Sequence, residues 1–420
     1  MTTLQLTIKA LSPLAIGRQK PGGSISEAQT YIPGSVIRGA IAGKMLRQSN
    51  TEDNANLDQP DSDFQKLFLA ENAAIFSNAY PSREGHPVYV LPATAVSSKN
   101  DPGFLPEPYA NNPGFRPEKP VGVFDTLIDA FCAEGYGYPY DPVCLNGDRA
   151  EPYSKFYTVN NGQYQVHSID TRLLTRVGIN RRRATAEEQV LYSIEAINQI
   201  QTKTKQPTVF SSTISLDDED NGRDNALASQ LRTYLEQQHW RLGGSASRGL
   251  GKVEIEVTQP VQTTVITTRI QTFNQAMRDR WLEWGNVFGH PEPFPENQQY
   301  FTLDLQADAI LSDQWRRTTV ISPEMLRQMT GLQDSSLELH AVYSSYDYRS
   351  GWNAAWGLMK DVELATNRGA VYLFSTSQLE QWIPQLEQLE IKGVGERTTE
   401  GFGQVQVCNE FHHVFREVAV

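Results

Sequence analysis

Two glycine-rich segments constrain this chain most, because each stands between a helical pattern and a strand pattern. The first is RLGGSASRGLGKVEIEV, residues 241–257, and the second is IKGVGERTTEGFGQVQV, residues 391–407. Leucine-spaced sequence precedes both segments, and both close on Gly-x-Gly before valines alternate with polar residues. A long segment that recurs together with its flanking patterns predicts two copies of one structural module.

The glycines of the first loop point to a close approach between backbones. Glycine has no Cβ and adopts positive φ readily, so another backbone can come near and amide N–H groups can converge. Arg248 and Lys252 add charge that suits a phosphate or an anionic polymer. Lys252 is followed by Val253, which excludes a phosphate loop, and a dinucleotide fingerprint leads from a strand into a helix instead. The alternative is a flexible turn from helix to strand.

The overall charge restricts any nucleic-acid contact to a local surface. The chain has 420 residues and a formal net charge of -12, which argues against a protein that coats RNA or DNA indiscriminately. Its three cysteines are too few for a disulfide framework. The N-terminus has no basic segment before an apolar stretch, and no window approaches the length of a membrane span. We therefore expect a cytoplasmic protein with no membrane contact.

The start of the chain predicts a strand, a loop and a helix. Apolar residues alternate from Leu4 to Ala10, and the loop 17–30 that follows carries Arg18 and Lys20. Ser35 is a good N-cap for a helix with Arg38 in its first turn. A cation is unfavourable there, so an anionic partner near Arg38 is one interpretation and a solvated arginine is the other.

The middle of the first half predicts a large insertion, about residues 50–165. Prolines crowd the stretch 81–120, so we expect no regular element there. Cys132 and Cys144 could bind zinc together with His86 or His167, but reduced and partly buried thiols fit the sequence better. We therefore predict no metal site.

A basic hairpin is predicted at about residues 166–195. Five arginines lie among leucine and β-branched residues, namely Arg172, Arg176, Arg181, Arg182 and Arg183. Such an arm can follow a phosphate backbone, with guanidinium groups bridging phosphates or stacking on bases. The alternative is that Glu187, Glu188 and Glu195 neutralise it.

The order of patterns predicts an α+β protein with two ferredoxin-like βαββαβ domains in tandem. The first domain is 1–262 and includes the insertion and the hairpin. The second is 263–420, begins with an amphipathic helix at about 265–289, and restates the first strand at YFTLDLQADAIL from Tyr300.

Several stretches together resemble the repeat-associated mysterious protein (RAMP) superfamily of CRISPR systems. They are YIPGSVIRGA, GINRRRATAEEQVLYSIEAI, GWNAAWGLMK, GAVYLF and the two glycine-rich loops. Within the superfamily the chain is most similar to the tandem-domain subunit of type III-D effector complexes. The resemblance covers nearly the whole chain, but residues 50–120 lack a matching pattern.

The resemblance implies a subunit that binds the 5′ repeat-derived handle of a guide RNA, caps an antiviral effector complex, and contacts other RAMP subunits and the large signalling subunit. It also implies which residues contact RNA, with no cofactor. These residues are Arg18, Lys20, Arg38, Arg172, Arg176, Arg181, Arg182, Arg183, Gly243, Gly244, Ser245, Arg248, Gly249, Gly251, Lys252, Lys360, Lys392, Gly393, Gly395, Arg397, Gly401 and Gly403.

The same resemblance bears on RNA cleavage. Target-cleaving relatives carry an aspartate in the loop after the first strand, whereas the only acid of loop 17–30 is Glu27. We therefore expect no catalytic residue. Three alternatives stay open, a metal-dependent backbone ribonuclease, a guide-processing endoribonuclease that uses His86 or His167, and a purely protein–protein scaffold that shows no salt-dependent RNA binding.

Overall fold

The structure is a computed structural model. It describes residues 2–18, 27–49, 62–83, 86–105, 120–160, 162–180, 185–217, 227–258, 260, 264–288, 293–295, 297–353 and 357–416. Lys20, Arg181, Arg182 and Arg183 lie outside these residues. Within them, no helix is long and apolar enough to cross a membrane.

An antiparallel sheet forms the core of the first half. Strand β1 (Thr2–Ala10) lies between β14 (Lys252–Thr258) and β12 (Val209–Leu216), and β12 also pairs with β2 (Ile75–Phe76) and β3 (Tyr80–Ser82). The short β13 (Trp240–Arg241) lies beside β14. The predicted alternation in β1 is confirmed, because Leu6 and Ile8 are fully buried. Helices α1 (Gly34–Ser49) and α4 (Leu227–Gln237) add Ile37, Ile41, Leu231 and Leu235 to the same buried cluster.

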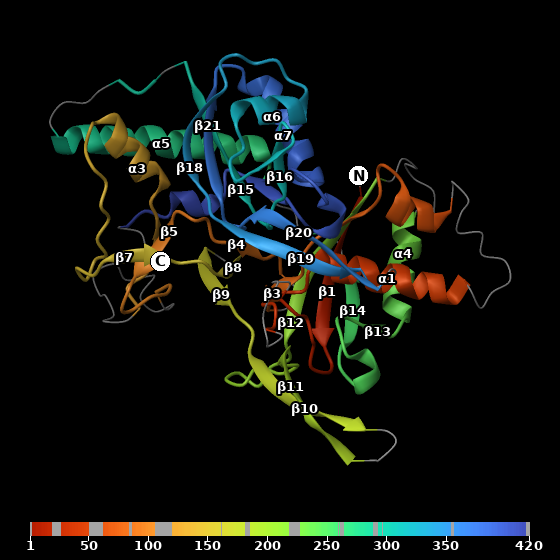
Figure 1. Ribbon diagram of the computed structural model, residues 1–420. Coiled ribbons are helices and arrows are strands. Elements are labelled where there is room, and N and C mark those ends of the chain that lie inside the picture. Colours follow the sequence, from red (N-terminus) through yellow and green to blue (C-terminus); the bar gives the residue numbers. More distant parts are fainter. Residues whose placement is uncertain are drawn as a thin grey trace.

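The second half repeats this strand order. Strand β15 (Gln299–Leu305) lies between β22 (Val405–Val407) and β21 (Val371–Thr376), and β18 (Glu338–Tyr343) follows β21. In both sheets the first strand therefore pairs with the last strand and with the strand before the last helix. Three helices pack against the second sheet, namely α5 (Ile266–Phe288), α6 (Pro323–Thr330) and α7 (Leu379–Lys392). Figure 1 shows the two halves with the sheet of each.

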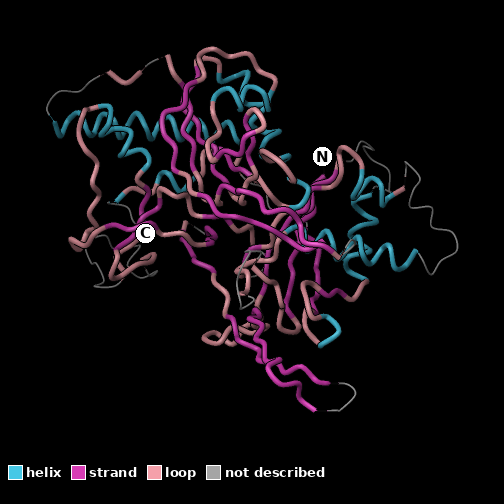
Figure 2. The backbone as a smooth tube through the Cα atoms, in the orientation of Figure 1, coloured by secondary structure: helices cyan, strands magenta, loops and turns pink. Residues whose placement is uncertain are grey.

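Each half also carries a long two-stranded ribbon just before the third strand of its sheet. In the first half it is β10 (Thr171–Asn180) with β11 (Thr185–Ile197), and in the second half it is β19 (Tyr346–Asn353) with β20 (Leu358–Thr366). The first ribbon projects well away from its sheet (Figure 2). The bridges Leu14–Ile197 and Ala309–Thr366 hold the two ribbons at equivalent points after the first strand. The first ribbon lies where the basic hairpin was predicted, and Arg172 and Arg176 are its described arginines. The second ribbon was not predicted.

A small hairpin follows the first strand in each half as well. Arg18 N–H donates to the Glu27 carbonyl at 2.7 Å, and Gln29 N–H donates to the Ile16 carbonyl at 2.7 Å. In the second half, β16 (Leu311–Asp313) pairs with β17 (Arg316–Thr318) at the matching place. The repeated patterns of the sequence therefore correspond to a repeated structure.

The insertion contains more regular structure than its prolines predicted. Strands β5 (Ala95–Ser98), β6 (Val123–Asp125) and β7 (Ala150–Pro152) form one small sheet, and β4 (Tyr89–Val90), β8 (Phe156–Asn160) and β9 (Gln163–His167) form another. The expectation of no regular element at 81–120 was wrong, since very short strands fit between prolines and pair with distant partners. Helix α3 (Leu127–Gly135) packs against α5, so the insertion shares the core of the second half.

Candidate functional site

The two glycine-rich loops have the same backbone conformation. Positive φ angles occur in the first loop at Gly243 (84°), Ser245 (57°), Gly249 (86°) and Gly251 (86°). They recur in the second loop at Gly395 (77°), Arg397 (57°), Gly401 (90°) and Gly403 (67°). A short 3-10 helix lies in the middle of each loop, at Ala246–Arg248 and Thr398–Glu400. Residue 248 of the first loop is therefore equivalent to residue 400 of the second.

Close backbone contacts explain two of these glycines. Gly244 N–H donates to the Ala15 carbonyl at 2.8 Å, and a Cβ on Gly243 would lie 2.5 Å from that same oxygen. In the second loop Glu396 N–H donates to the Ile310 carbonyl at 2.9 Å, and a Cβ on Gly395 would clash with that oxygen. The close approach predicted from sequence is confirmed, and the approaching backbone is the protein's own segment after the first strand.

The first loop is open to solvent beside the first ribbon. Gly243, Gly244, Arg248 and Gly249 are exposed, and nothing lies within 4 Å of where a Cβ of Gly249 would be. The Arg248 guanidinium donates to the Tyr192 hydroxyl of β11 and lies 5.8 Å from the centre of its ring. This contact places the loop and the ribbon on one continuous surface.

The register of the ribbon gathers cations on that surface. Arg176 lies opposite Tyr192 in the neighbouring strand. Arg172 comes four residues earlier in β10, so its side chain lies on the same face of the ribbon as that of Arg176. Glu195 lies opposite Leu173, on the other face, and its carboxylate binds Thr171 and the Ala28 amide. Among the described residues, no carboxylate pairs with Arg172, Arg176, Arg248 or Lys252. We call Arg172, Arg176 and Arg248, with Tyr192, the cationic face. Lys252 is exposed on β14, on the same strand face as Glu254 and Glu256, and is not counted in it.

The second loop is closed instead, because it joins the two halves. Gly401 is buried, and its carbonyl accepts a hydrogen bond from the Asn78 amide at 2.9 Å, while Asn78 Oδ1 accepts one from Gly34 N–H at 2.9 Å. Glu400 accepts hydrogen bonds from Arg397 at 2.6 Å and Lys360 at 2.8 Å. Burial raises the pKa of Glu400, but these two hydrogen bonds outweigh it and hold the pKa below its usual value. Glu400 is therefore the counter-ion of Arg397 and Lys360, two cations that the sequence analysis expected to contact RNA.

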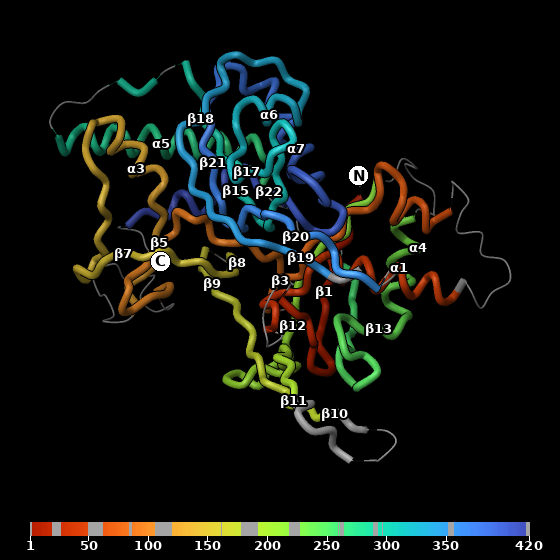
Figure 3. The backbone as a smooth tube through the Cα atoms, viewed as in Figure 1, coloured from red at the N-terminus to blue at the C-terminus, as the bar shows by residue number. Residues whose placement is uncertain are grey.

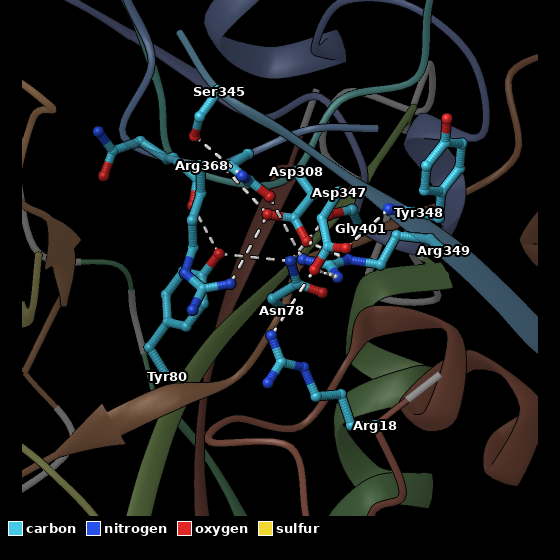
Figure 4. Close-up of polar contacts among 12 residues, drawn as sticks. Arg18, Asn78, Tyr80, Asp308, Ser345, Asp347, Tyr348, Arg349, Arg368 and Gly401 are labelled. Carbon is cyan, nitrogen blue, oxygen red and sulfur yellow. Dashed lines mark hydrogen bonds and ion pairs between the residues drawn. The ribbon is translucent and has the colours of Figure 1, made fainter. Parts of the chain in front are cut away.

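A buried ion-pair network lies beside this joint (Figure 4). Asp308 Oδ2 accepts from Arg349 at 2.9 Å, and Asp308 Oδ1 lies 3.6 Å from Arg368. Arg349 also bonds to Asp347 at 2.9 Å, and Asp347 lies 3.6 Å from Arg18. Burial lowers the pKa of Arg349, but Asp308 outweighs it, so the pKa is raised and the charge is fixed. Figure 3 shows β19 and β20 reaching from the second half toward the strands of the first. The contact between Arg18 and Asp347 of β19 is drawn in Figure 4.

This network lines a small pocket between the halves. Its walls are Gly17, Arg18, Gln29, Tyr31, Pro33, Ser35, Asn78, Asp308, Arg349, Glu400, Gly401 and Phe402. The guanidinium of Arg368 also lies 4.9 Å from the centre of the Tyr31 ring. Each charged residue of the pocket wall is already paired with an opposite charge. The pocket is therefore part of the contact between the two halves.

Other predicted residues are used within the protein. Arg38 donates to the Phe68 carbonyl at 2.6 Å and lies over the Phe68 ring. The sequence analysis considered an anionic partner for Arg38, but its partner in the structure is this backbone oxygen. Ser35 is not the N-cap, because α1 begins at Gly34, whose N–H is bound by Asn78. Lys392 is exposed, and Gly393 has positive φ against the Gly403 carbonyl.

Of the alternative catalytic and zinc residues, His167, Cys132 and Cys144 are buried, whereas His86 is exposed. His167 Nε2 lies 2.8 Å from the Thr158 hydroxyl, and burial, with Arg83 and His86, lowers its pKa to about 4. Burial raises the pKa of Cys132 to about 12 and also raises that of Cys144. The two thiols lie in different apolar clusters. The described part of the chain contains no group of three or more residues suited to hold a metal.

Some features of the candidate site were not identified from the sequence. Tyr192 was visible in the alternation of LYSIEAI but was not selected, and Asp308 follows the restated first strand. The second ribbon was readable as alternation around GWNAAWGLMK. The closing of the second loop depends on Asn78, more than three hundred residues earlier, and no local pattern carries it.

A sequence model described as "RAMP superfamily" matches residues 7–254 of this chain. The chain belongs to the RAMP superfamily. No curated protein matches it significantly. Among solved structures, the RAMP chain matches a chain of "Cryo-EM structure of the Type III-B Cmr-beta bound to cognate target RNA" with 12% identity and a TM-score of 0.42, covering 88% of this chain and 86% of the other. A chain of the same complex with AMPPnP matches with 12% identity and a TM-score of 0.41, covering 90% and 88%.

Proposed function

We propose that this RAMP protein is a non-catalytic RNA-binding subunit of a CRISPR effector complex. The observation that carries the proposal is the cationic face, since Arg172, Arg176 and Arg248 stand exposed or half-exposed without carboxylate partners among the described residues. Cations held near one another without acidic partners attract a phosphate backbone. The face also lies within the residues that match the superfamily.

Each half is proposed to be a ferredoxin-like domain. Both sheets have the order fourth, first, third, second, when the strands are counted along the repeated module. Two helices connect these strands in each half, which is the βαββαβ arrangement. Domain boundaries near residue 262 follow from this interpretation, with α5 opening the second domain.

The halves are proposed to have different roles. In the first half the loop and ribbon are open and cationic, whereas in the second half Glu400, Asp308 and Asp347 neutralise the equivalent surface. We therefore assign RNA to the first half and the positioning of that half to the second. The RNA is proposed to be the 5′ handle of the guide, in a complex of the type III-D class.

The geometry favours binding over cleavage. Glu27 of the first hairpin is an exposed partner of Arg18 at 3.6 Å, and Asp308 after β15 is held by two arginines. The buried His167 has its ring nitrogen on Thr158. A carboxylate whose oxygens already contact two guanidinium groups is a poor metal ligand, because those cations occupy its oxygens and repel a metal ion. A metal-dependent ribonuclease and a histidine-based processing nuclease remain the alternatives that the experiment must separate.

The acidic remainder of the chain supports contacts with other proteins. With a net charge of -12, most of the surface repels RNA, which confines RNA to the cationic face. Other RAMP subunits and the large signalling subunit are the proposed neighbours.

The test is to mix purified protein with labelled repeat RNA in magnesium and to follow binding and cleavage together. We expect binding without cleavage. The variant Arg176→Glu with Arg248→Glu should bind at least tenfold more weakly, since two phosphate contacts become repulsive. A matched reversal of two exposed lysines elsewhere, Lys66→Glu with Lys155→Glu, should bind within about twofold of wild type.

The possible results separate the three functions. Cleavage that is lost on Glu27→Ala would support the metal-dependent ribonuclease, and cleavage lost on His86→Ala or His167→Ala would support the processing nuclease. Equal weakening by both pairs of charge reversals would mean that the cationic face is not the RNA site. Circular dichroism must show that each variant is folded.

A further inference from the structure

Trp315 occupies an unusual position at the tip of the second-half hairpin. Asp313 pairs with Arg316, so Gln314 and Trp315 form a two-residue turn, and their φ angles are 44° and 67°. Asn and Gly are the residues that favour this conformation, and tryptophan is a poor choice for it. The indole is nevertheless fully exposed, at 102% of its reference area. Backbone strain of this kind concentrates at functional sites. Because the indole is exposed, packing in a core does not explain why tryptophan stands here.

The hairpin that carries Trp315 is firmly mounted. Arg317 donates to Glu363 of β20 at 2.7 Å and also to Glu396 of the second loop. Ser312 donates to Glu396 at 2.7 Å from the opposite strand. The base of the hairpin is thus fixed to the second ribbon and the second loop, and the tip projects as a rigid platform.

The surroundings of Trp315 favour a nucleobase over a protein groove. Within the hairpin, described residues 311–318, Trp315 is the only large apolar side chain that is exposed, although the second ribbon, to which the hairpin is bound, exposes Tyr346, Tyr348, Leu358, Met359 and Val362. Its neighbour Arg316 is exposed and has no carboxylate partner among the described residues. An exposed indole next to a guanidinium that has no carboxylate partner among the described residues suits one unpaired base and its phosphate.

Contacts between side chains connect this hairpin with the first half. Arg18 of the first hairpin contacts Asp347, and Asp347 binds Arg349. Arg349 lies opposite Glu363 in the second ribbon, and Glu363 binds Arg317. The two hairpins therefore both contact the second ribbon, the first through Asp347 and the second through Glu363.

We propose that Trp315 is a stacking platform for an unpaired base of the RNA, with Arg316 on the adjacent phosphate. This inference rests on the proposed function and extends it, because the second half then contributes one specific contact to the strand that the first half binds. The contact is by stacking and is tolerant of base identity, since every base has an aromatic face.

The experiment uses the full chain and a single-stranded oligoadenylate of about 20 nucleotides, long enough to cover several binding positions. Trp315→Ala, Trp315→Phe and wild type are compared by anisotropy of the labelled RNA and by tryptophan fluorescence. We expect Trp315→Ala to weaken binding about tenfold and Trp315→Phe to recover most of the affinity, because phenylalanine also stacks. RNA should quench wild-type fluorescence more than that of Trp315→Phe. The salt dependence of binding should stay unchanged in both variants, since no charge is removed.

Three results would overturn the inference, and they differ in what they leave standing. If wild type binds but Trp315→Ala binds equally well without a difference in quenching, the platform is wrong and the cationic face survives, and Trp315 is then free for a protein partner. If Trp315→Phe is as weak as Trp315→Ala, stacking is not the cause. If wild type binds neither this oligoadenylate nor the labelled repeat RNA, the proposed function falls together with this inference. Charge reversal at Arg176 and Arg248 reports on the proposed function alone.

Discussion

Arg248 and Glu400 occupy the same position in the two glycine-rich loops, and each bonds to the ribbon of its own half. Arg248 donates to Tyr192 of β11, whereas Glu400 accepts from Lys360 of β20. The same contact between loop and ribbon thus occurs in both halves, but the loop residue is a cation in the first half and an anion in the second. The change leaves the first loop cationic and open, and it makes the second loop a neutral joint between the halves.

The first prediction concerns Glu400. Glu400→Gln removes the charge that compensates Arg397 and Lys360 where the carboxylate is largely buried, at 18% side-chain exposure. We expect the free energy of unfolding to fall by about 2 kcal/mol, because two cations lose their counter-charge. The control is Glu396→Gln, whose carboxylate is 47% exposed and should cost less than about 1 kcal/mol. Denaturant unfolding measures both, and equal losses would contradict the role of Glu400 as a joint.

A matched pair of glycines gives the second prediction. Gly249 and Gly401 are equivalent and have φ of 86° and 90°. A Cβ on Gly401 would lie 2.7 Å from Asn78 Oδ1 and 3.0 Å from the Phe76 carbonyl, whereas a Cβ on Gly249 meets nothing. Alanine at either position carries the left-handed backbone cost of about 1 kcal/mol.

We expect Gly401→Ala to cost about 2 kcal/mol more than Gly249→Ala, because it also separates the two halves. Thermal unfolding of the two variants side by side measures the difference. Similar melting temperatures would show that the second loop is not tightly seated on the first half. Gly249→Ala should also leave the RNA affinity of the cationic face within a few fold, since the loop has room for a methyl group there.

Local patterns predicted the loops and the first ribbon, because each depends on residues that are close in sequence. Alternation predicts β1 and β14, and repeated glycines in one spacing predict the positive φ angles of both loops. The interaction partner of each cation could not be predicted in this way. Arg38 ends on the Phe68 carbonyl and Lys360 ends on Glu400, and both partners come from distant elements. The pairing that decides between an RNA site and a joint is tertiary.

The third prediction uses salt to count phosphate contacts. Arg172→Ala, Arg176→Ala and Arg248→Ala together should reduce the slope of log Kd against log salt by about 2, since each lost phosphate contact to a single strand contributes about 0.7. Replacing Arg349 should leave the slope unchanged, because that side chain is already bound to Asp308 and Asp347. Filter binding across a salt series measures the slopes. An unchanged slope in the triple variant would remove these arginines from the site.

The last prediction concerns a buried histidine that fixes the C-terminal segment. His412 Nε2 lies 2.8 Å from Asp304 of β15, and Nδ1 lies 3.2 Å from Asp125 of the insertion. Burial lowers the pKa of His412, but the two carboxylates outweigh it and raise the pKa to about 10. Since this lies above the unfolded value near 6.5, the protonated ring stabilises the fold fully below pH 6.5.

That stabilisation should disappear as the pH rises through about 10, so wild type should lose stability between pH 7 and pH 10. His412→Gln cannot carry the charge, and its unfolding free energy should be lower by about 3 kcal/mol at pH 6.5 but should approach wild type near pH 10. Comparing the two proteins at each pH cancels the titration of cysteines and tyrosines, which both contain. Urea unfolding from pH 6 to pH 10 measures the difference. A constant gap between the curves would mean that His412 is neutral in the folded protein and acts by packing alone.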